Sequence, residues 1–286
     1  MPSVELSAGT IEYDDSGGGG PIVVLFGGLA IGRSLWNGVV GLLREDMRCI
    51  VPALPWGAHR IPMRADAQLT MRGQAAILGE FIAALDLREV TLVENDTAMS
   101  QVLCADGCDR VARLVITSCE AFDNYPPGLP GKAIALAAKL PGGLFLATQQ
   151  LRIRWLRRGP LGFGWMAKRP IADDELDRWL RPLLTQGEIR RDLRKYAANL
   201  DRSVLVVSAE RLRDFDRPAL VVWAREDRVM PPAHGRALAE LLPQGRLVEV
   251  EDSYTLIPHD QPGRLAREIR AFVAEASGGE REIAGS

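Results

Sequence analysis

The chain has 286 residues, 47% of them hydrophobic, and a net charge of −2 at pH 7. This length and composition are typical of one globular domain of the larger α/β kind, with room for an inserted subdomain. The 35 basic and 37 acidic residues nearly balance, which argues against nucleic acid or an anionic membrane surface as a partner.

The sequence carries no signal for a membrane or for export. No apolar run approaches the roughly 20 residues of a membrane span. The N-terminal residues MPSVELSAG lack the basic stretch and the apolar core of a signal peptide. We therefore expect a cytoplasmic protein, a monomer or a homodimer, that needs neither a cofactor nor a metal.

Short apolar segments alternate with amphipathic ones in the first and last thirds of the chain. Thr70 is placed to cap the second of the expected helices. The strands are predicted at Thr10–Asp15, Ile22–Phe26, Cys49–Leu54, Val90–Val93, Val111–Thr117, Ala219–Trp223 and Arg246–Val250. The helices are predicted at Leu35–Leu43, Thr70–Leu85, Thr97–Ala105, His234–Leu242 and Leu265–Ala276. This alternation predicts a mostly parallel sheet with helices on both faces.

Residues 124–209 break the alternation, because they are rich in Leu, Arg, Trp and Pro and have a helical pattern. Only Val204–Val207 is ambiguous between helix and strand. We expect a helical cap over the carboxyl ends of the strands, where ligands bind in open α/β sheets. The expected units are a core at 1–123 and 210–276, the cap at 124–209, and a disordered tail at 277–286.

The most informative motif is V-T-L-V-E-N-D-T-A-M-S, residues 90–100. A buried strand ends there and a helix starts with almost no loop, which is the setting of a nucleophile elbow. Asp96 occupies the central position. Glu94 and Ala98 stand where such elbows usually carry glycine.

These features resemble the α/β-hydrolase superfamily, and especially its branch with an aspartate nucleophile, the haloalkane dehalogenases and epoxide hydrolases. V-V-L-F-G-G-L, residues 23–29, resembles the strand and oxyanion loop of that family. V-V-W-A-R-E-D-R-V-M-P, residues 221–231, resembles the loop that bears the triad acid and matches it to Asp227. E-D-S-Y-T-L-I-P-H-D-Q-P, residues 251–262, resembles the loop that carries the catalytic histidine. The resemblance implies an α/β-hydrolase fold with the cap inserted after the sixth strand, and a small organic substrate in a pocket beneath that cap.

The departures from the family are as informative as the matches. The position of the catalytic histidine holds Thr255, which is not a base near neutral pH. An aspartate nucleophile forms an ester without a base, but hydrolysis of that ester needs an activated water. Three histidines are present. His259, four residues beyond the expected position, reaches the site only if its loop shifts by one turn.

A second chemistry is open to the same residues. Glu94, Asp96 and Asp227 are expected at neighbouring strand ends, where crowded carboxylates raise one another's pKa and create an acid–base pair. Such a pair suits a lyase, isomerase or cyclase. In the alternative interpretation Glu94 points away and pairs with an arginine, while Asp96 caps the helix.

The resemblance also implies a substrate-binding set. The backbone amides of Leu29 and Thr97 correspond to the family's oxyanion hole, beside Gly28. Glu120 is a second candidate for the acid of the triad, because some dehalogenases place it after this strand. Tyr254 is assigned to the substrate pocket, and Trp165 is expected either to line that pocket or to pack the cap on the core.

Three functions remain open from the sequence. The first is an enzyme without a full triad that uses carboxylate acid–base chemistry. The second is an aspartate-nucleophile hydrolase for an epoxide, ester or halide, with a relocated histidine; its cap tyrosine candidates are Tyr125 and Tyr196. The third is a non-catalytic protein that binds a small ligand.

Overall fold

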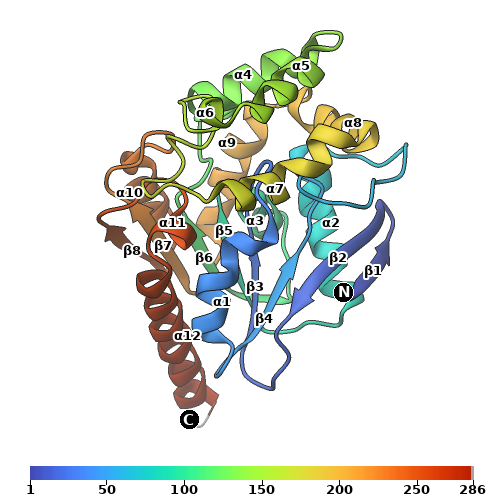
Figure 1. Ribbon diagram of the computed structural model, residues 1–286. Coiled ribbons are helices and arrows are strands. Elements are labelled where there is room, and N and C mark those ends of the chain that lie inside the picture. Colours follow the sequence, from blue (N-terminus) through green and yellow to red (C-terminus); the bar gives the residue numbers. More distant parts are fainter. Residues whose placement is uncertain (285–286) are drawn as a thin grey trace.

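An eight-stranded sheet forms the centre of the computed structural model, which describes residues 1–284 (Figure 1). The strand order is β1-β2-β4-β3-β5-β6-β7-β8, with β1 and β2 antiparallel to their neighbours and the other strands parallel. The strands are β1 (Ser3–Leu6), β2 (Gly9–Asp15), β3 (Ile22–Phe26), β4 (Arg48–Pro52), β5 (Val90–Asn95), β6 (Val111–Thr117), β7 (Ala219–Ala224) and β8 (Gly245–Val250). The prediction of a mostly parallel sheet flanked by helices is confirmed, and β1 is a strand that the sequence patterns did not indicate.

Helices cover both faces of this sheet. In the view of Figure 1, α1 and α12 lie together in front of the sheet, and α2 and α3 lie together behind it. The core helices are η1 (Arg33–Trp36), α1 (Asn37–Leu43), α2 (Met71–Ala84), α3 (Met99–Ala105), α10 (Pro232–Leu241), α11 (Ile257–Asp260) and α12 (Pro262–Ala284). The Thr70 side chain accepts a hydrogen bond from the Gly73 amide, so the predicted cap of α2 is confirmed.

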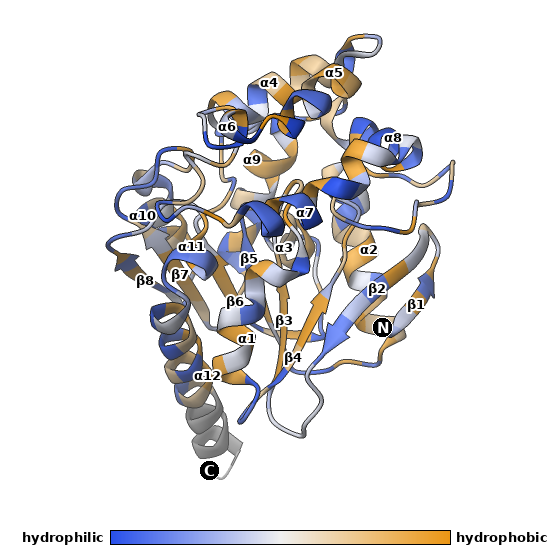
Figure 2. Ribbon diagram, viewed as in Figure 1, coloured by the Kyte–Doolittle hydropathy of each residue, from blue (hydrophilic) through white to orange (hydrophobic). Residues whose placement is uncertain are grey.

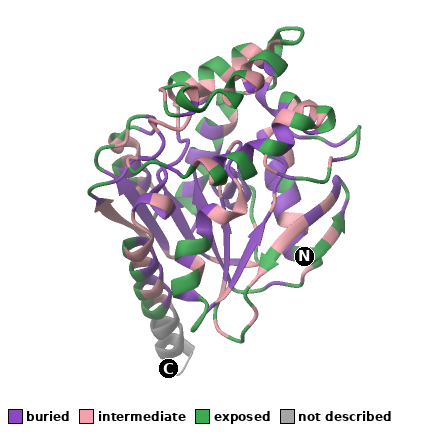
Figure 3. Ribbon diagram, viewed as in Figure 1, coloured by how far each residue is buried: buried purple, intermediate pink, exposed green. Residues whose placement is uncertain are grey.

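The inner strands are mostly hydrophobic (Figure 2) and enclosed on both faces (Figure 3). All six residues of β5 and all six of β7 are buried. Such continuous burial is the pattern of parallel strands covered on both sides. In β5, Glu94 and Asn95 are buried together with the apolar residues.

A layer of short helices lies over the carboxyl ends of the strands, at the top of Figure 1. It contains α4 (Gly128–Lys139), α5 (Gly143–Gln149), η2 (Gln150–Arg152), α6 (Arg154–Arg157), α7 (Asp173–Thr185) and α8 (Gly187–Ala197). The ambiguous segment Val204–Val207 is helical and belongs to α9 (Arg202–Arg211), which η3 (Leu212–Asp214) follows. Because α9 packs against α3 of the core, we propose that the cap ends ahead of α9 rather than at residue 209.

The final helix continues beyond its expected end at Ala276. α12 runs from Pro262 to Ala284, so the disorder expected from residue 277 is a wrong prediction up to residue 284, and residues 285–286 lie outside the described part of the chain. Glu, Arg and Ala follow the Gly278–Gly279 pair, and these residue types favour helix. Within residues 1–284, none of the helices combines the length and the hydrophobicity that crossing a membrane requires.

Two helical glycines provide a test of core packing. A Cβ atom added to Gly235 in α10 would lie 2.6 Å from Cδ2 of the buried Trp223, whereas one added to Gly41 in α1 meets no atom within 4 Å. We expect Gly235→Ala to lower the free energy of unfolding by about 1–3 kcal/mol through overpacking. Gly41→Ala, the matched control, should raise it by about 0.5–1 kcal/mol. Urea unfolding of both variants measures the difference, and an equal effect at the two positions would contradict this account.

Candidate active site

Asp96 occupies a sharp turn between β5 and α3. Its φ angle is 63°, in the left-handed region that few residues other than glycine adopt. A Cβ atom on Gly28 would collide with Oδ2 of Asp96, so the neighbouring loop approaches this closely only because residue 28 has no side chain. Ala98 holds the N-cap position of α3 without a side-chain hydrogen bond. The alternative in which Asp96 caps the helix is therefore wrong.

The Asp96 carboxyl is enclosed and faces another acid. Burial is the main reason why its pKa lies well above the usual range, and the charge of Asp227 raises the pKa further. The backbone amide of Leu29 opposes this shift and lowers the pKa of Asp96. Thr97, the next residue, is fully buried, and its hydroxyl has no hydrogen-bond partner.

Glu94 does not join Asp96, contrary to the predicted carboxylate cluster. Its carboxylate accepts hydrogen bonds from the Ser100 amide at 2.8 Å and from Nε2 of Gln101 at 3.0 Å. The first turn of α3 offers free amides to an acceptor from the preceding strand, and this attracts the side chain away from the pocket. The partner is the start of a helix and not the arginine of the alternative interpretation. Burial raises the pKa of Glu94 to about 7.

Glu120 takes the place expected of Glu94. It follows β6, is only 5% exposed, and has a pKa raised well above the usual range, first by burial and then by the charge of Asp96. The Ala98 amide and the Tyr196 hydroxyl act in the opposite direction and lower its pKa, and its Oε2 is buried without a hydrogen-bond partner. Tyr196 comes from α8, and its hydroxyl lies 3.1 Å from that of Tyr125. A core carboxyl and two tyrosines that flank it therefore meet beside Asp96.

Thr255 forms the contact with Asp227 that a histidine in its position is expected to form. Its hydroxyl donates to Oδ1 of Asp227 at 2.8 Å, and the Val229 and Met230 amides donate to the same oxygen. Oδ2 of Asp227 is buried without a hydrogen-bond partner. Burial raises the pKa of Asp227 to about 6. The Thr255 carbonyl accepts a hydrogen bond from Nδ2 of Asn95 at 2.8 Å, which ties this loop to the end of β5.

None of the three imidazoles contacts Asp96. Nε2 of His259 lies 3.2 Å from the Arg169 carbonyl, because the loop keeps its register and α11 turns the side chain outward. The one-turn shift that would bring His259 to the site does not occur. His59 lies 3.3 Å from Asp192, and His234 lies 3.7 Å from an exposed Asp123.

Tyr254 and Trp165 lie outside the substrate pocket. The Tyr254 ring packs under the Arg228 guanidinium at 4.5 Å. Trp165 packs partly buried against the core, whereas its neighbours Phe163 and Met166 line the pocket.

A cavity of about 110 Å³ lies between the cap and the strand ends. Its polar lining consists of Asp96, Glu120, Tyr196 and Thr148, and among the residues that the structure describes no lysine, arginine or histidine lines it. The remaining lining is apolar and includes Leu29, Trp56, Ile134, Leu151, Phe163, Met166, Leu180, Leu183, Leu193 and Val229. This lining fits a small, largely apolar molecule with one reactive polar group. The sequence did not indicate that Tyr196 lies beside Glu120, because residues 120 and 196 are far apart in the chain and only the fold brings them together.

Comparison with known proteins identifies the fold. No protein-family model matches the sequence. A curated protein, the uncharacterized hydrolase YugF of Bacillus subtilis (strain 168), is 31% identical over 64 residues, and this match spans 22% of the chain and 23% of that protein.

Solved structures match over nearly the whole length. The haloalkane dehalogenase DbeA-M1 loop variant from Bradyrhizobium elkanii has a TM-score of 0.80 at 17% identity, with 98% of each chain covered. Wild-type DBJA has a TM-score of 0.79 at 16% identity, covering 97% of this chain and 99% of that one. An esterase from Thermogutta terrifontis has a TM-score of 0.69 at 20% identity, covering 96% and 99%.

The buried Glu94 carboxyl should make stability depend on pH. Its pKa rises from an ordinary 4.5 to about 7 in the folded protein, so the folded state holds more protons than the unfolded chain between these values. The contribution of Glu94 to stability is therefore complete below about pH 4.5 and is lost as the pH rises through 7. When the pH is raised from 4.5 to 8, the free energy of unfolding of Glu94→Gln should rise by about 3 kcal/mol relative to that of the native chain. Urea unfolding across this range measures the gain.

The control for this prediction is Glu188→Gln, at an exposed position in α8. Its difference from the native chain should stay within about 0.5 kcal/mol at every pH. A flat difference for Glu94→Gln as well would contradict the burial of a titrating carboxyl at this position.

Proposed function

We propose that this chain, which has the α/β-hydrolase fold, is an enzyme that acts on a small, largely apolar organic molecule by carboxylate acid–base chemistry and without a complete triad. The observation that carries the proposal is the pairing of Asp96 with Glu120 in one cavity that no basic side chain of the described residues lines. Two carboxyl groups that are buried together and lack a counter-charge do not both ionise near neutral pH. One of them then holds a proton while the other is free to accept one.

This pair supports a reaction in which a proton leaves one atom of the substrate and is returned to another. The ionised carboxylate takes a proton from the substrate, and the protonated carboxyl delivers one, so the pair ends with as many protons as it had at the start. Isomerisation, elimination and cyclisation all leave the number of protons on the pair unchanged, and none of them consumes water. The Tyr196 hydroxyl lowers the pKa of Glu120 and so favours its ionised form.

The second candidate is an aspartate-nucleophile hydrolase. It is favoured by the position of Asp96 on the strained turn, with the Leu29 amide directed at it, and by the similarity of the fold to haloalkane dehalogenases. Attack by the ionised Asp96 carboxylate on the carbon of a haloalkane forms an ester, breaks the carbon–halogen bond and releases the halide. A water must then cleave that ester into the alcohol and the Asp96 carboxylate. With no imidazole beside Asp96, the acceptor for the proton of that water is Oδ2 of Asp227, which is buried and unpartnered.

Isotope labelling separates these two reactions. The chain is incubated in H₂¹⁸O and in D₂O with a panel of small apolar ketones, epoxides, esters and haloalkanes, and both products and protein are analysed by mass spectrometry. Acid–base chemistry predicts deuterium in the substrate or product and no ¹⁸O in either product or the Asp96 peptide. Label in the Asp96 carboxyl after one turnover would instead establish the hydrolase. If compounds bind but none is turned over, both reactions are rejected and the chain is a ligand-binding protein.

The carboxyl pair also predicts the dependence of turnover on pH. Because burial raises the pKa of both Asp96 and Glu120, the rate should fall as the pH rises and the pair loses its last proton. Glu120→Gln and Asp96→Asn should each lower kcat by about 100-fold or more. Asp123→Asn, at an exposed site after the same strand, is the matched control and should keep both the rate and the profile. An unchanged alkaline limb in Glu120→Gln would exclude Glu120 from the reaction.

A further inference from the structure

Large hydrophobic side chains are exposed together on the outer face of the cap. They come from α4, α5 and α6 and from the residues at the ends of these helices, at the top of Figure 1, and Figure 3 shows exposed residues along α4 and α5. The group, which we call the cap patch, consists of Leu129, Leu136, Leu140, Leu146, Ile153 and Trp155, and these residues are 47–73% exposed. Single exposed hydrophobic residues are ordinary, but a group of them on one face indicates a binding surface.

The cap patch faces away from the active-site cavity. Ile134, Thr148 and Leu151, from the same layer of helices, line that cavity with the inner face of the layer. On α4, residues three or four positions apart are neighbours on one side of the helix. Positions 129, 132, 136 and 139 therefore share the outer side, where Leu129 and Leu136 alternate with two lysines.

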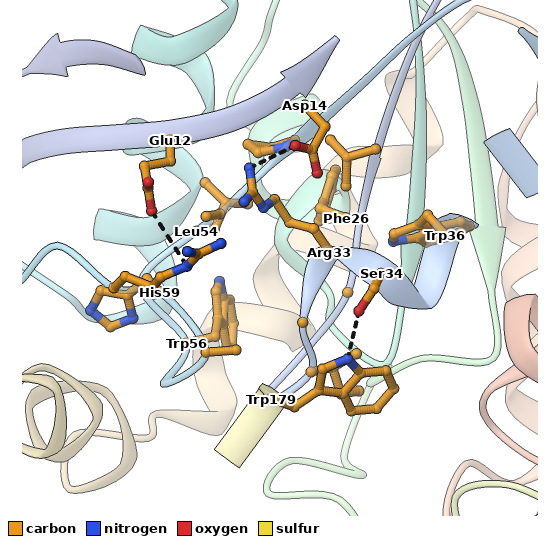
Figure 4. Close-up of a pocket in the computed structure, with 18 of the residues that line it drawn as sticks. Glu12, Asp14, Phe26, Arg33, Ser34, Trp36, Leu54, Trp56, His59 and Trp179 are labelled. Carbon is orange, nitrogen blue, oxygen red and sulfur yellow. Dashed lines mark hydrogen bonds and ion pairs between the residues drawn. The ribbon is translucent and has the colours of Figure 1, made fainter. Parts of the chain in front are cut away.

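Contacts with the core hold the cap in this orientation. Nε1 of Trp179, on α7, donates a hydrogen bond to Oγ of Ser34 in η1 at 2.8 Å, and Figure 4 shows this bond. Nε2 of the buried His59 lies 3.3 Å from Oδ2 of the buried Asp192, on α8. Because α7 and α8 attach the cap to the core, α4, α5 and α6 present their outer sides to the surroundings.

The face that carries the cap patch is basic. Residues 124–172 include eight lysines and arginines and no aspartate or glutamate. Those that are exposed and form no ion pair with any described residue are Lys132, Lys139 and Arg152. Arg154 and Arg158 share one carboxylate, that of Asp173, and the other three are paired with acids from elsewhere in the chain. The near balance of charge over the whole chain, which argued against an anionic membrane surface, is therefore not the balance of this face.

A membrane surface that contains anionic lipids fits both properties of this face. Leucine and tryptophan side chains with basic residues between them are typical of protein surfaces that lie in the interface between lipid and water. The stems of Lys132 and Lys139 can lie along the apolar side chains while their amines reach lipid phosphates. A second copy of this chain fits less well, because a two-fold contact through the patch would bring these lysines close to the same lysines of the other copy.

We propose that the cap patch docks this protein on an anionic membrane surface. Leu136, Leu146 and Trp155 enter the interfacial region of the lipid, and the neighbouring basic residues bind lipid phosphates. Docking of this kind is peripheral and needs no helix that crosses the membrane. It does not depend on the reaction proposed for Asp96.

Co-sedimentation of the full chain with lipid vesicles tests the docking. Vesicles of phosphatidylcholine with one third phosphatidylglycerol are compared with vesicles of phosphatidylcholine alone. We expect the chain to bind the anionic vesicles about 10-fold more tightly or better. This preference should disappear when NaCl is raised from about 0.1 M to 1 M, because the screening length falls from about 10 Å to 3 Å.

Two charge variants with the same net charge separate the patch from the overall charge of the chain. Lys132→Gln combined with Lys139→Gln should weaken binding to the anionic vesicles by about 10-fold or more. Arg44→Gln combined with Arg267→Gln, at exposed positions in the core, is the matched control and should bind as the native chain does.

The apolar part of the patch has its own pair of variants. Leu136→Gln, at a side chain that is 62% exposed, should weaken binding by about 3-fold or more, since it removes apolar surface from the interface. Leu42→Gln, at a side chain of α1 that is 47% exposed, is the control and should have no effect. Vesicles with brominated lipid chains should quench tryptophan fluorescence, and Trp155→Phe should remove most of that quenching.

Two results would overturn the proposal. The first is the absence of binding to the anionic vesicles at the lower salt concentration; analytical ultracentrifugation and titration with polyglutamate then show whether the patch joins two copies or binds an acidic protein instead. The second is an equal loss of binding in the two charge variants, because binding would then reflect net charge alone. Thermal unfolding establishes that each variant is folded, and if Leu136→Gln does not fold, the charge variants decide the question.

Discussion

The left-handed backbone at Asp96 is the constraint on which the rest of the site depends. A strand buried along its whole length ends there, and α3 begins three residues later. The turn aims the carboxyl out of the sheet toward the cap, and the missing side chain of Gly28 leaves room for it. Strain of this kind persists only where the surroundings enforce it. Here β5, α3 and the loop at Gly28 enforce it together.

Around that turn, the hydrogen-bond donors next to each carboxyl group determine where that group points. Glu94 accepts hydrogen bonds from the first turn of α3, and Asp227 accepts them from two loop amides and the Thr255 hydroxyl. The hydroxyl of Tyr196, which comes from the cap, lowers the pKa of Glu120. Asp96 and Glu120 are the members of this group that line the cavity. The enclosed, uncompensated charge that this arrangement creates is what we propose to be used as an acid–base pair.

Much of this organisation can be predicted from local pattern. Continuous apolar runs located the inner strands, because burial on both faces leaves no room for alternation. The elbow, the acid loop at Asp227 and the loop at Thr255 were recognised as motifs and lie near one another in the fold. The strand β1, the helical state of Val204–Val207 and the length of α12 were not predicted, since pairing and packing at a distance decide them.

The sequence by itself determined the mostly parallel sheet and placed Asp96 on its turn, because both follow from periodicity and from the order of residues along the chain. The tertiary structure alone decided which acids share the cavity. Glu94 and Glu120 both flank strand ends, yet one turns to the helix behind it and the other to Asp96. It also decided that His259 faces outward and that Tyr196 reaches Glu120. Such choices depend on which donors and how much free space surround each side chain, and residues far apart in the chain supply both.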